Sequence, residues 1–259
     1  MRIATWNVNS LKQRLPRVEE WLEYAKPDVL CLQETKLADS AFPQLTFSAL
    51  GYESVHHGQG RWNGVAILSR AGIEDVSHGF GDGVEDPYVG DARLLAATCG
   101  GVRVVSVYVP NGREVGSEFY ERKLTWLGCL RDWLATSAKP TDELAVLGDF
   151  NVAPEDRDVW DPKAFVGATH VTAPEREALT RLREWGLLDA FRQVWDEDWL
   201  FTYWDYRAGD FHQGRGMRID LAYMTEPLAK RITFALVDRN ARKGKSPSDH
   251  APMLIDLAD

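Results

Sequence analysis

Short apolar runs recur along the chain, and each one ends in polar residues. Four of them, each five to eight residues long and rich in β-branched side chains, cover residues 29–34, 64–68, 102–109 and 144–149. Runs of this length and composition are typical of strands that are buried on both faces. A final run covers residues 253–257. The pattern therefore predicts several buried strands with polar side chains at their ends.

Helical spacing separates some of these strands. Apolar side chains three and four positions apart predict one helix over residues 15–25 and a longer one over residues 120–134. A third helix is expected after Thr172, because Thr172 and Glu175 have the spacing of a capping box and Gly186 is placed to end the helix.

The order of these elements predicts the fold class. Strands that alternate with helices indicate a layered α/β protein. Between residues 52 and 110 strands follow one another without a helix, so parts of the sheets should be antiparallel. We therefore expect two packed mixed sheets with helices outside. The chain shows no linker, repeat or low-complexity tract, which predicts one domain over residues 1–259.

Composition narrows the class of protein without naming a partner. With 44% hydrophobic and 27% charged residues, the chain is neither disordered nor fibrous, and it has no apolar run long enough for a membrane span. Its three cysteines are far apart and the N-terminus turns polar early, which predicts a cytoplasmic protein with reduced thiols. The net charge of −9 argues against a protein that coats nucleic acid, but it does not exclude a local binding site.

The polar residues at the strand ends are the candidates for chemistry. They are Asn7, Asn9, Gln33, Glu34, Tyr108, Asn111, Asp149, Asn151, Asp249 and His250. Each has an ordinary explanation as a turn residue or a solvated strand end. If they converge on one edge, however, the cleft holds carboxylates, amides, a tyrosine and a histidine. Hard oxygen ligands of this kind suit Mg²⁺ or Mn²⁺, and a divalent ion so held is typical of phosphoryl chemistry.

Seven short motifs carry a family resemblance. They are Trp6-Asn-Val-Asn9, Leu32-Gln-Glu-Thr-Lys36, Gly64-Val-Ala-Ile-Leu68, Tyr108-Val-Pro-Asn111, Leu147-Gly-Asp-Phe-Asn151, Arg218-Ile-Asp-Leu221 and Ser248-Asp-His-Ala-Pro252. The sequence resembles the exonuclease III family of abasic-site endonucleases, within the endonuclease/exonuclease/phosphatase superfamily. The motifs span the chain in family order, so the resemblance covers its whole length.

The resemblance implies a fold and a metal site. It implies a four-layer α/β sandwich of two mixed β-sheets flanked by helices, with the cleft at one end. Glu34 resembles the principal metal ligand, assisted by Asn7 and Asn9, while Asp249 supports the metal or the leaving group. The implied ion is Mg²⁺, for which Mn²⁺ would substitute.

The resemblance also implies catalytic roles. Asp149 resembles the carboxylate that handles the proton of the attacking water, and Asn151 the residue that orients that water or the phosphate. His250 resembles the phosphate-contacting histidine and Asp220 its carboxylate partner, while Tyr108 and Asn111 face the scissile phosphate. The residues alone leave open which of Asp149, Tyr108 and His250 moves the proton.

Substrate recognition is expected from two further segments. Residues 201–207 and 216–220 resemble the family segment that lines the pocket for an extruded abasic sugar. Candidate pocket residues are Tyr203, Trp204, Met217 and Ile219, although Trp204 also fits an ordinary core aromatic. Candidate contacts to the phosphate backbone are Arg113, Arg207 and Arg215.

The implied function is Mg²⁺-dependent hydrolysis of the phosphodiester 5′ to an abasic site, with 3′→5′ exonuclease and 3′-phosphatase or phosphodiesterase activity. The expected partner is double-stranded DNA with abasic sites or blocked 3′ ends, bound by a monomer away from any membrane. Two alternatives remain, a phosphatase or phospholipid phosphodiesterase with the same fold and a non-catalytic nucleic-acid-binding regulator.

Overall fold

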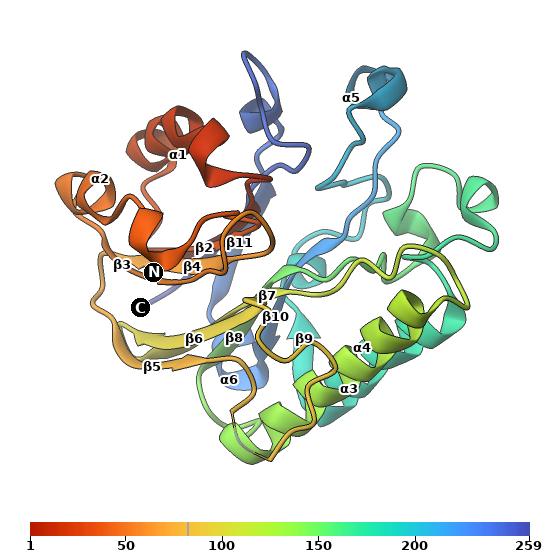
Figure 1. The fold of residues 1–259 in the computed structure, drawn as a ribbon, viewed down its shortest axis with the longest axis horizontal. Helices are drawn as coiled ribbons and strands as arrows, with labels where there is room; N and C mark the ends of the chain where they lie inside the picture. The colour runs from red at the N-terminus through yellow and green to blue at the C-terminus, as the bar shows by residue number, and fades with distance from the viewer. Residues whose placement is uncertain (82) are drawn as a thin grey trace.

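Two six-stranded sheets form the centre of the protein in the computed structural model, which describes residues 1–81 and 83–259. The first sheet has the strand order β11-β12-β1-β2-β4-β3 and the second the order β5-β6-β7-β8-β10-β9 (Figure 1). The strands of the first sheet are β1 (Arg2–Asn7), β2 (Val29–Gln33), β3 (Glu53–His57), β4 (Val65–Ser69), β11 (Ile232–Val237) and β12 (Met253–Leu257). Those of the second are β5 (Glu74–His78), β6 (Leu94–Cys99), β7 (Val102–Tyr108), β8 (Leu144–Asp149), β9 (Leu187–Asp189) and β10 (Asp220–Thr225).

Both sheets are mixed, as the sequence predicted. Strand β1 pairs with β2 in parallel, β7 pairs with β8 in parallel, and the other pairs of described strands are antiparallel. The antiparallel strands β3 to β6 follow one another in the region where no helix was expected. The five predicted strands are all present, with ends that differ from the expected ones by one residue at most.

Helices cover the outer face of each sheet (Figure 1). The covering helices are α1 (Leu11–Ala25) and α2 (Gln44–Ala49) on the first sheet and α3 (Glu118–Ser137) and α4 (Ala173–Trp185) on the second. Two short helices lie elsewhere: α5 (Asp210–Gln213) is on a projecting loop, and α6 (Glu226–Ala229) follows β10 and places Leu228 in the core between the sheets. The three helices predicted from apolar spacing correspond to α1, α3 and α4. At the start of α4, the Thr172 hydroxyl accepts from the Glu175 amide and the Glu175 carboxylate accepts from the Thr172 amide, so the capping box is confirmed.

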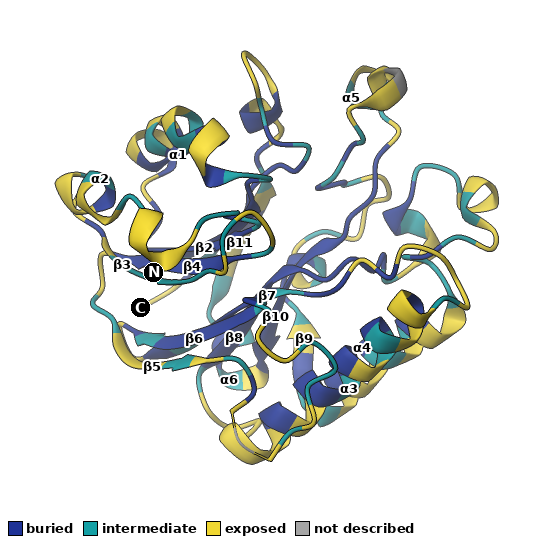
Figure 2. Ribbon diagram, viewed as in Figure 1, coloured by how far each residue is buried: buried dark blue, intermediate teal, exposed yellow. Residues whose placement is uncertain are grey.

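Three hydrophobic cores define four layers. One core lies between the two sheets and includes Ile3 from β1 and Leu147 from β8. A second packs the other face of the second sheet against α3 and α4, and a third packs the first sheet against α1 and α2. Figure 2 shows the corresponding pattern, with buried strands at the centre and helices that are exposed along their outer sides. The protein is therefore a four-layer α/β sandwich. No helix in the described ranges is both long and apolar enough to cross a membrane.

The strand pairings bring the expected site residues to one edge. In the parallel pairs, Asn7 lies opposite Gln33 and Tyr108 lies opposite Asp149 at the carboxyl ends of the strands. Asp220 begins the antiparallel strand β10, and it also lies opposite Asp149. Because β1 and β8 belong to different sheets, the edge receives polar side chains from both halves of the sandwich.

Candidate active site

The Asn7 side chain joins the two sheets at this edge. Its amide nitrogen donates to Glu34 Oε1 at 2.8 Å and to Asp149 Oδ2 at 2.9 Å. One buried amide therefore holds a carboxylate from each sheet. Glu34 lies directly after β2 with a φ of 51°, a left-handed conformation that is unusual for a residue with a side chain.

The Glu34 carboxylate is ionised. Burial alone would raise its pKa, but the nearby Lys36 ammonium and the hydrogen bonds from Lys36 and Asn7 lower the pKa below the usual value. Lys36 Nζ lies 2.8 Å from Glu34 Oε2 and donates to Asn9 Oδ1 at 2.6 Å. Asn9 Nδ2 in turn donates to Asp249 Oδ1 at 3.1 Å. Lys36 and Asn9 therefore connect Glu34 with Asp249.

His250 is held between two carboxylates. Its Nδ1 lies 2.7 Å from Asp220 Oδ2, and its Nε2 lies 3.9 Å from Asp149 Oδ2. Burial alone would lower the pKa of His250, but the charge and hydrogen bond of Asp220, aided by Asp149, raise the pKa to about 10. His250 is therefore an imidazolium at neutral pH, with Nε2–H directed toward Asp149.

The pKa of Asp149 is shifted in the opposite direction from that of Glu34. Burial raises the pKa of Asp149 to about 7; the His250 cation lowers the pKa, and the negative charges of Asp220 and Glu34 add to the rise. Its Oδ1 accepts from the Asn151 backbone amide at 2.9 Å. A carboxylate with a pKa near neutrality can accept a proton from water and release it again, which suits a general base.

Tyr108, Asn111 and Asn151 lie beside this group. Burial, together with Glu34 and Asp149, raises the pKa of Tyr108 well above its usual value, so its phenol stays neutral and can only donate. Asn111 Nδ2 donates to Asn151 Oδ1 at 3.2 Å, and Asn151 Nδ2 donates to the Val109 carbonyl at 2.9 Å. The two amides are thus connected to each other and to the end of β7.

The donor set fits a hard divalent cation. Ligand atoms of Glu34, Asp149 and His250 lie within 4.8 Å of one another. An imidazolium whose Nδ1 bonds Asp220 has no lone pair to offer, so His250 does not fit a ligand role. The remaining donors are carboxylate and amide oxygens, which suit Mg²⁺ or Mn²⁺. Among the described residues, the Oδ1 atom of Asp220, the carboxylate that pairs with His250, is buried without a hydrogen-bond partner.

The residues expected to line a sugar pocket are only partly accessible. Tyr203 is half-buried, and its ring lies 4.9 Å from the His250 ring. Met217 is 7% exposed and pairs with Tyr203 through backbone hydrogen bonds. Trp204 and Ile219 are 1% and 2% exposed and lie inside small hydrophobic cores, so in this conformation neither forms an open wall. Their contact with substrate stays a prediction that requires these segments to move.

The three arginines expected at the DNA backbone are exposed. Arg113 stacks over the Phe119 ring at 3.7 Å, and its backbone amide donates to Asn111 Oδ1 at 3.1 Å. Arg207 pairs with Asp205 at 2.6 Å, and Arg215 lies over the Trp160 ring at 5.2 Å. Arg113 is thus tied directly to a site residue, whereas the other two lie on outlying segments.

Four residues that the sequence reasoning left without a role contact the site or its supports: Lys36, Lys123, His170 and Glu175. Lys36 lies within the motif of residues 32–36, and Glu175 belongs to the predicted capping box, but neither pattern by itself indicates a contact with the site. Lys123 occurs on the buried face of α3, three positions after Tyr120. A lysine on the apolar face of a predicted helix is a signal that could have been recognised.

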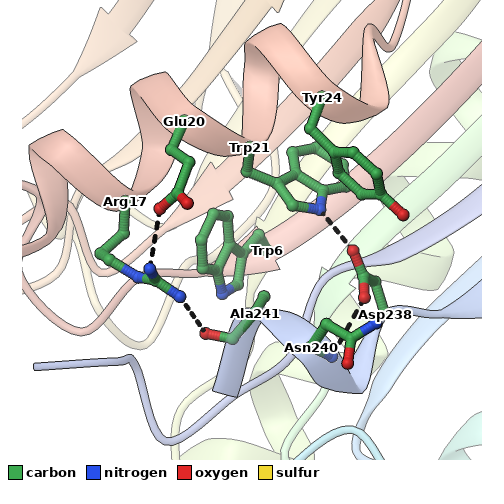
Figure 3. A pocket seen from close by; sticks show the side chains of 8 residues that line it. All are labelled: Trp6, Arg17, Glu20, Trp21, Tyr24, Asp238, Asn240 and Ala241. Carbon is green, nitrogen blue, oxygen red and sulfur yellow. Dashed lines mark hydrogen bonds and ion pairs between the residues drawn. The ribbon is translucent and has the colours of Figure 1, made fainter. Parts of the chain in front are cut away.

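A separate cavity lies on the outer side of the first sheet, next to α1. It has a volume of about 320 Å³ and is lined by Trp6, Arg17, Glu20, Trp21, Tyr24, Asp238, Asn240 and Ala241 (Figure 3). The Trp21 indole donates to Asp238 at 3.0 Å, and the Trp6 indole donates to the His250 carbonyl at 3.1 Å. This cavity contains none of the expected catalytic residues, so we do not assign the chemistry to it.

Comparison with known proteins identifies the family. The endonuclease/exonuclease/phosphatase family matches residues 4–250, which is nearly the whole chain. The chain belongs to this family. Exodeoxyribonuclease III of Haemophilus influenzae is 31% identical, with 98% of each chain covered.

Solved structures of this family agree with the sandwich described above. An AP endonuclease from Archaeoglobus fulgidus is 36% identical with a TM-score of 0.95, covering 99% of both chains. A 3′ phosphatase from Neisseria, bound to a product DNA hairpin, is 37% identical with a TM-score of 0.94, covering 100% of both chains. This member of the endonuclease/exonuclease/phosphatase family is therefore a DNA repair nuclease.

Proposed function

We propose that the protein hydrolyses phosphate esters of duplex DNA in a Mg²⁺-dependent reaction, for which Mn²⁺ substitutes. The observation that carries the proposal is the line of Asp220, His250 and Asp149, which faces Glu34 and is joined to it by Asn7. It combines a proton acceptor, a cationic donor and a metal-binding carboxylate within one buried edge. Metal-assisted hydrolysis of a phosphodiester uses these three functions to activate water and neutralise charge on the phosphoryl oxygens.

The protonation states support one assignment of the proton transfers. Asp149 accepts the proton of the attacking water, because with a pKa of about 7 it is the only one of the three candidates that is substantially unprotonated near neutral pH. His250, with a pKa of about 10, donates a hydrogen bond from Nε2 to a phosphoryl oxygen. Tyr108 donates as a neutral phenol, since the pKa of its hydroxyl is raised too far for it to act as a base.

The metal-binding side chains are Glu34 as the principal ligand, with Asn7, Asn9 and Asp249 around it. A bound divalent ion neutralises charge on the phosphoryl oxygens and lowers the pKa of water. Asn7 orients the Glu34 and Asp149 carboxylates through its amide nitrogen, and Asn9 does the same for Asp249. Asn111 and Asn151 orient the phosphate and the attacking water.

The proposal includes two DNA substrates. One is the phosphodiester 5′ to an abasic site, in which case Tyr203 and Met217 are the pocket residues best placed to contact the extruded sugar. The other is a blocked or ordinary 3′ end, which requires no extruded sugar and therefore no opening of the segments that bury Trp204 and Ile219. Arg113, Arg207 and Arg215 would contact the phosphate backbone. We propose that the protein acts as a monomer in the cytoplasm; the contacts among Asn7, Glu34, Asp149, Asp220 and His250 all lie within one chain.

The test uses two labelled duplexes, one with a single synthetic abasic site and one with a 3′-phosphate. The wild type is compared with Glu34→Gln and Asp149→Asn in Mg²⁺, Mn²⁺ and EDTA. We expect EDTA to abolish hydrolysis and each variant to lose at least ~100-fold in kcat/KM, or ~2.7 kcal/mol of barrier stabilisation. Glu143→Gln is the matched control, because Glu143 directly precedes β8 and pairs with Arg231 away from the cleft.

The products distinguish the possible activities. Incision 5′ to the abasic site together with 3′ processing supports both substrates. Processing of the 3′ end alone assigns the cleft to end trimming and shows that the sugar pocket is wrong. If the wild type leaves both duplexes intact but hydrolyses inositol phosphates or sphingomyelin, the alternative phosphatase or phospholipid activity holds. Metal-independent DNA binding without turnover would favour a non-catalytic regulator.

A further inference from the structure

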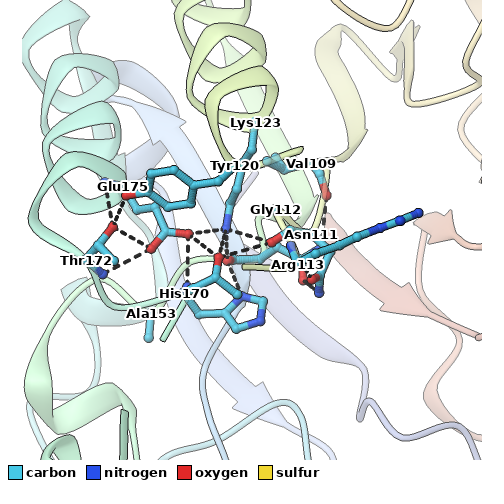
Figure 4. Close-up of polar contacts among 12 residues, drawn as sticks. Val109, Asn111, Gly112, Arg113, Tyr120, Lys123, Ala153, His170, Thr172 and Glu175 are labelled. Atoms are coloured by element: carbon cyan, nitrogen blue, oxygen red, sulfur yellow. Dashed lines mark hydrogen bonds and ion pairs between the residues drawn. The ribbon is translucent and has the colours of Figure 1, made fainter. Parts of the chain in front are cut away.

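A buried ion pair lies beneath the two site amides, outside the catalytic group described above. Lys123 of α3 and Glu175 of α4 both have fully buried side chains, and Lys123 Nζ lies 2.5 Å from Glu175 Oε1. Figure 4 shows these two side chains pointing toward each other between the helices and the loops that follow β7 and β8. A buried ion pair is weak evidence for stability in itself, because two charges lose their hydration when they are buried.

The Lys123 ammonium bonds to the backbone of both amide residues. Its Nζ donates to the Asn151 carbonyl at 2.7 Å and to the Asn111 carbonyl at 3.2 Å. Asn111 follows β7 and Asn151 follows β8, so one ammonium connects the two loops. Asn151 has a φ of 52°, a left-handed conformation that must be held by its surroundings.

Glu175 fixes the ammonium from the other side. Its Oε1 also accepts from the Thr169 hydroxyl at 2.7 Å and from the His170 amide at 2.9 Å, while Oε2 accepts from the Thr172 amide at 3.0 Å. Burial alone would raise the pKa of Glu175, but Lys123 and these hydrogen bonds lower it to about 2. The carboxylate is therefore ionised whenever the protein is folded at neutral pH.

The chain also leaves room for the lysine stem. Gly112 has a φ of 85°, and a Cβ at this position would lie 2.9 Å from Lys123 Cδ and 3.1 Å from Thr169 Oγ1. The loop between Asn111 and Arg113 thus packs directly onto the Lys123 side chain. Its conformation and the position of the lysine depend on each other.

We propose that Lys123 and Glu175 form a positioning pair that sets Asn111 and Asn151 against Tyr108 and Asp149 for the chemical step. Neither charge reaches the cleft, and both act through the backbone of the two amide residues. Loosening the pair lowers kcat, leaves metal binding unchanged because Glu34 does not contact the pair, and changes DNA binding little because Arg207 and Arg215 lie on other segments. The role of the pair in catalysis rests on the proposed hydrolytic function. Its effect on the positions of the two amides does not depend on that function.

The test variant is Lys123→Met/Glu175→Gln, which removes both charges together and so leaves no unpaired buried charge. We expect kcat per folded molecule to fall about 10- to 100-fold, the loss typical of a small misplacement of catalytic groups. The Kd for DNA in EDTA should stay within twofold of the wild-type value. The folded fraction is measured by circular dichroism at each assay temperature, so a loss of stability is not counted as a loss of kcat.

A second measurement reads the positioning directly. In NMR spectra of metal-free protein, the side-chain amide protons of Asn111 and Asn151 should exchange with solvent at least 10-fold faster in the double variant. The matched control is Arg2→Met/Asp256→Asn at the opposite end of β1, where Arg2 pairs with Asp256 at 2.7 Å and donates to the Ala25 carbonyl at 2.7 Å. It should change neither kcat nor the exchange of the two amides.

Retention of wild-type amide exchange in the double variant overturns the proposal, whatever its activity. So does a kcat per folded molecule within twofold of wild type, which would leave the pair a purely structural contact. If the wild type hydrolyses neither duplex, the proposed function fails, and the exchange measurement still decides whether the pair positions the amides.

Discussion

At the level of single residues, two neighbouring buried side chains have opposite roles. Asp149 and His250 are both enclosed, yet Asp149 is held near neutrality as a base and His250 is held as a cation. Burial favours the neutral form of both groups and raises the pKa of Asp149, whereas the charge and hydrogen bond of Asp220 overcome burial at His250. The residue types at the strand ends were visible in the sequence. Their protonation states depend on distances of about 3–4 Å between residues far apart in the chain, which the sequence does not contain.

The Asp220–His250 pair should make stability depend on pH. The folded pKa of His250 is about 10 against an ordinary value of 6.5, so the pair stabilises the protein fully below pH 6.5. This contribution is lost as the pH rises from 6.5 through 10. In EDTA, we expect Asp220→Asn to lower the free energy of unfolding by about 2–4 kcal/mol at pH 6 and by less than ~1 kcal/mol at pH 10.

Urea unfolding at the two pH values measures this difference. Glu143→Gln serves as the control, and its smaller effect should stay nearly constant between the two values. A loss for Asp220→Asn that is equally large at pH 10 would mean that the contribution of the pair does not depend on titration of His250 between pH 6 and pH 10.

At the level of elements, local signals identified the helices and strands well. The capping box of Thr172 and Glu175, the glycine after α4 and the apolar runs of β2, β7 and β8 are all present as expected. Such features depend on neighbours within a few positions, which is why sequence reveals them. The short helices α2, α5 and α6 were not predicted, because four to six residues carry too little periodicity.

Strands β7 and β8 approach each other closely at Gly148, and a substitution at this glycine tests that approach. Gly148 has a φ of 154°, and a Cβ there would lie 1.8 Å from the Val107 carbonyl oxygen. Gly148→Ala should therefore force the two strands apart, displace Tyr108 from Asp149 and destabilise the protein by more than ~2 kcal/mol. Chemical denaturation and the abasic and 3′-phosphate assays measure the two effects.

Gly128→Ala is the matched control for that change. Gly128 lies in α3, and a Cβ added there would have no atom within 4 Å, so alanine should stabilise the helix by about 0.5–1 kcal/mol. If Gly148→Ala were as stable and active as Gly128→Ala, the strands would not approach as closely as described.

At the level of the whole molecule, the site exists because two sheets end at the same edge. Glu34 comes from the first sheet and Asp149 from the second, and Asn7 holds them together. A cation bound between them should therefore stabilise the whole sandwich. At a concentration of Mn²⁺ of ~100 Kd, the expected gain is about 2.7 kcal/mol, or a rise in Tm of roughly 5–10 °C.

Differential scanning calorimetry with and without Mn²⁺ tests this coupling. EDTA should reverse the rise, and Glu34→Gln should remove it, whereas Glu143→Gln should retain it. A rise in Tm that survives Glu34→Gln would place the stabilising ion elsewhere on the protein.

The amino-acid sequence was sufficient for the local features of this protein. Apolar spacing predicted the main strands and helices, and polar residues at strand ends predicted an oxygen-rich, metal-binding edge, because both depend on patterns over a few neighbouring positions. Family motifs added the roles expected for Glu34, Asp149 and His250.

Contacts between residues far apart in the chain determined the features that the sequence did not predict. The bridge by Asn7, the burial of Trp204 and Ile219, and the Lys123–Glu175 pair each join segments separated by tens of residues or more. Their energies depend on which side chains exclude water from one another, and that is a property of the folded arrangement alone.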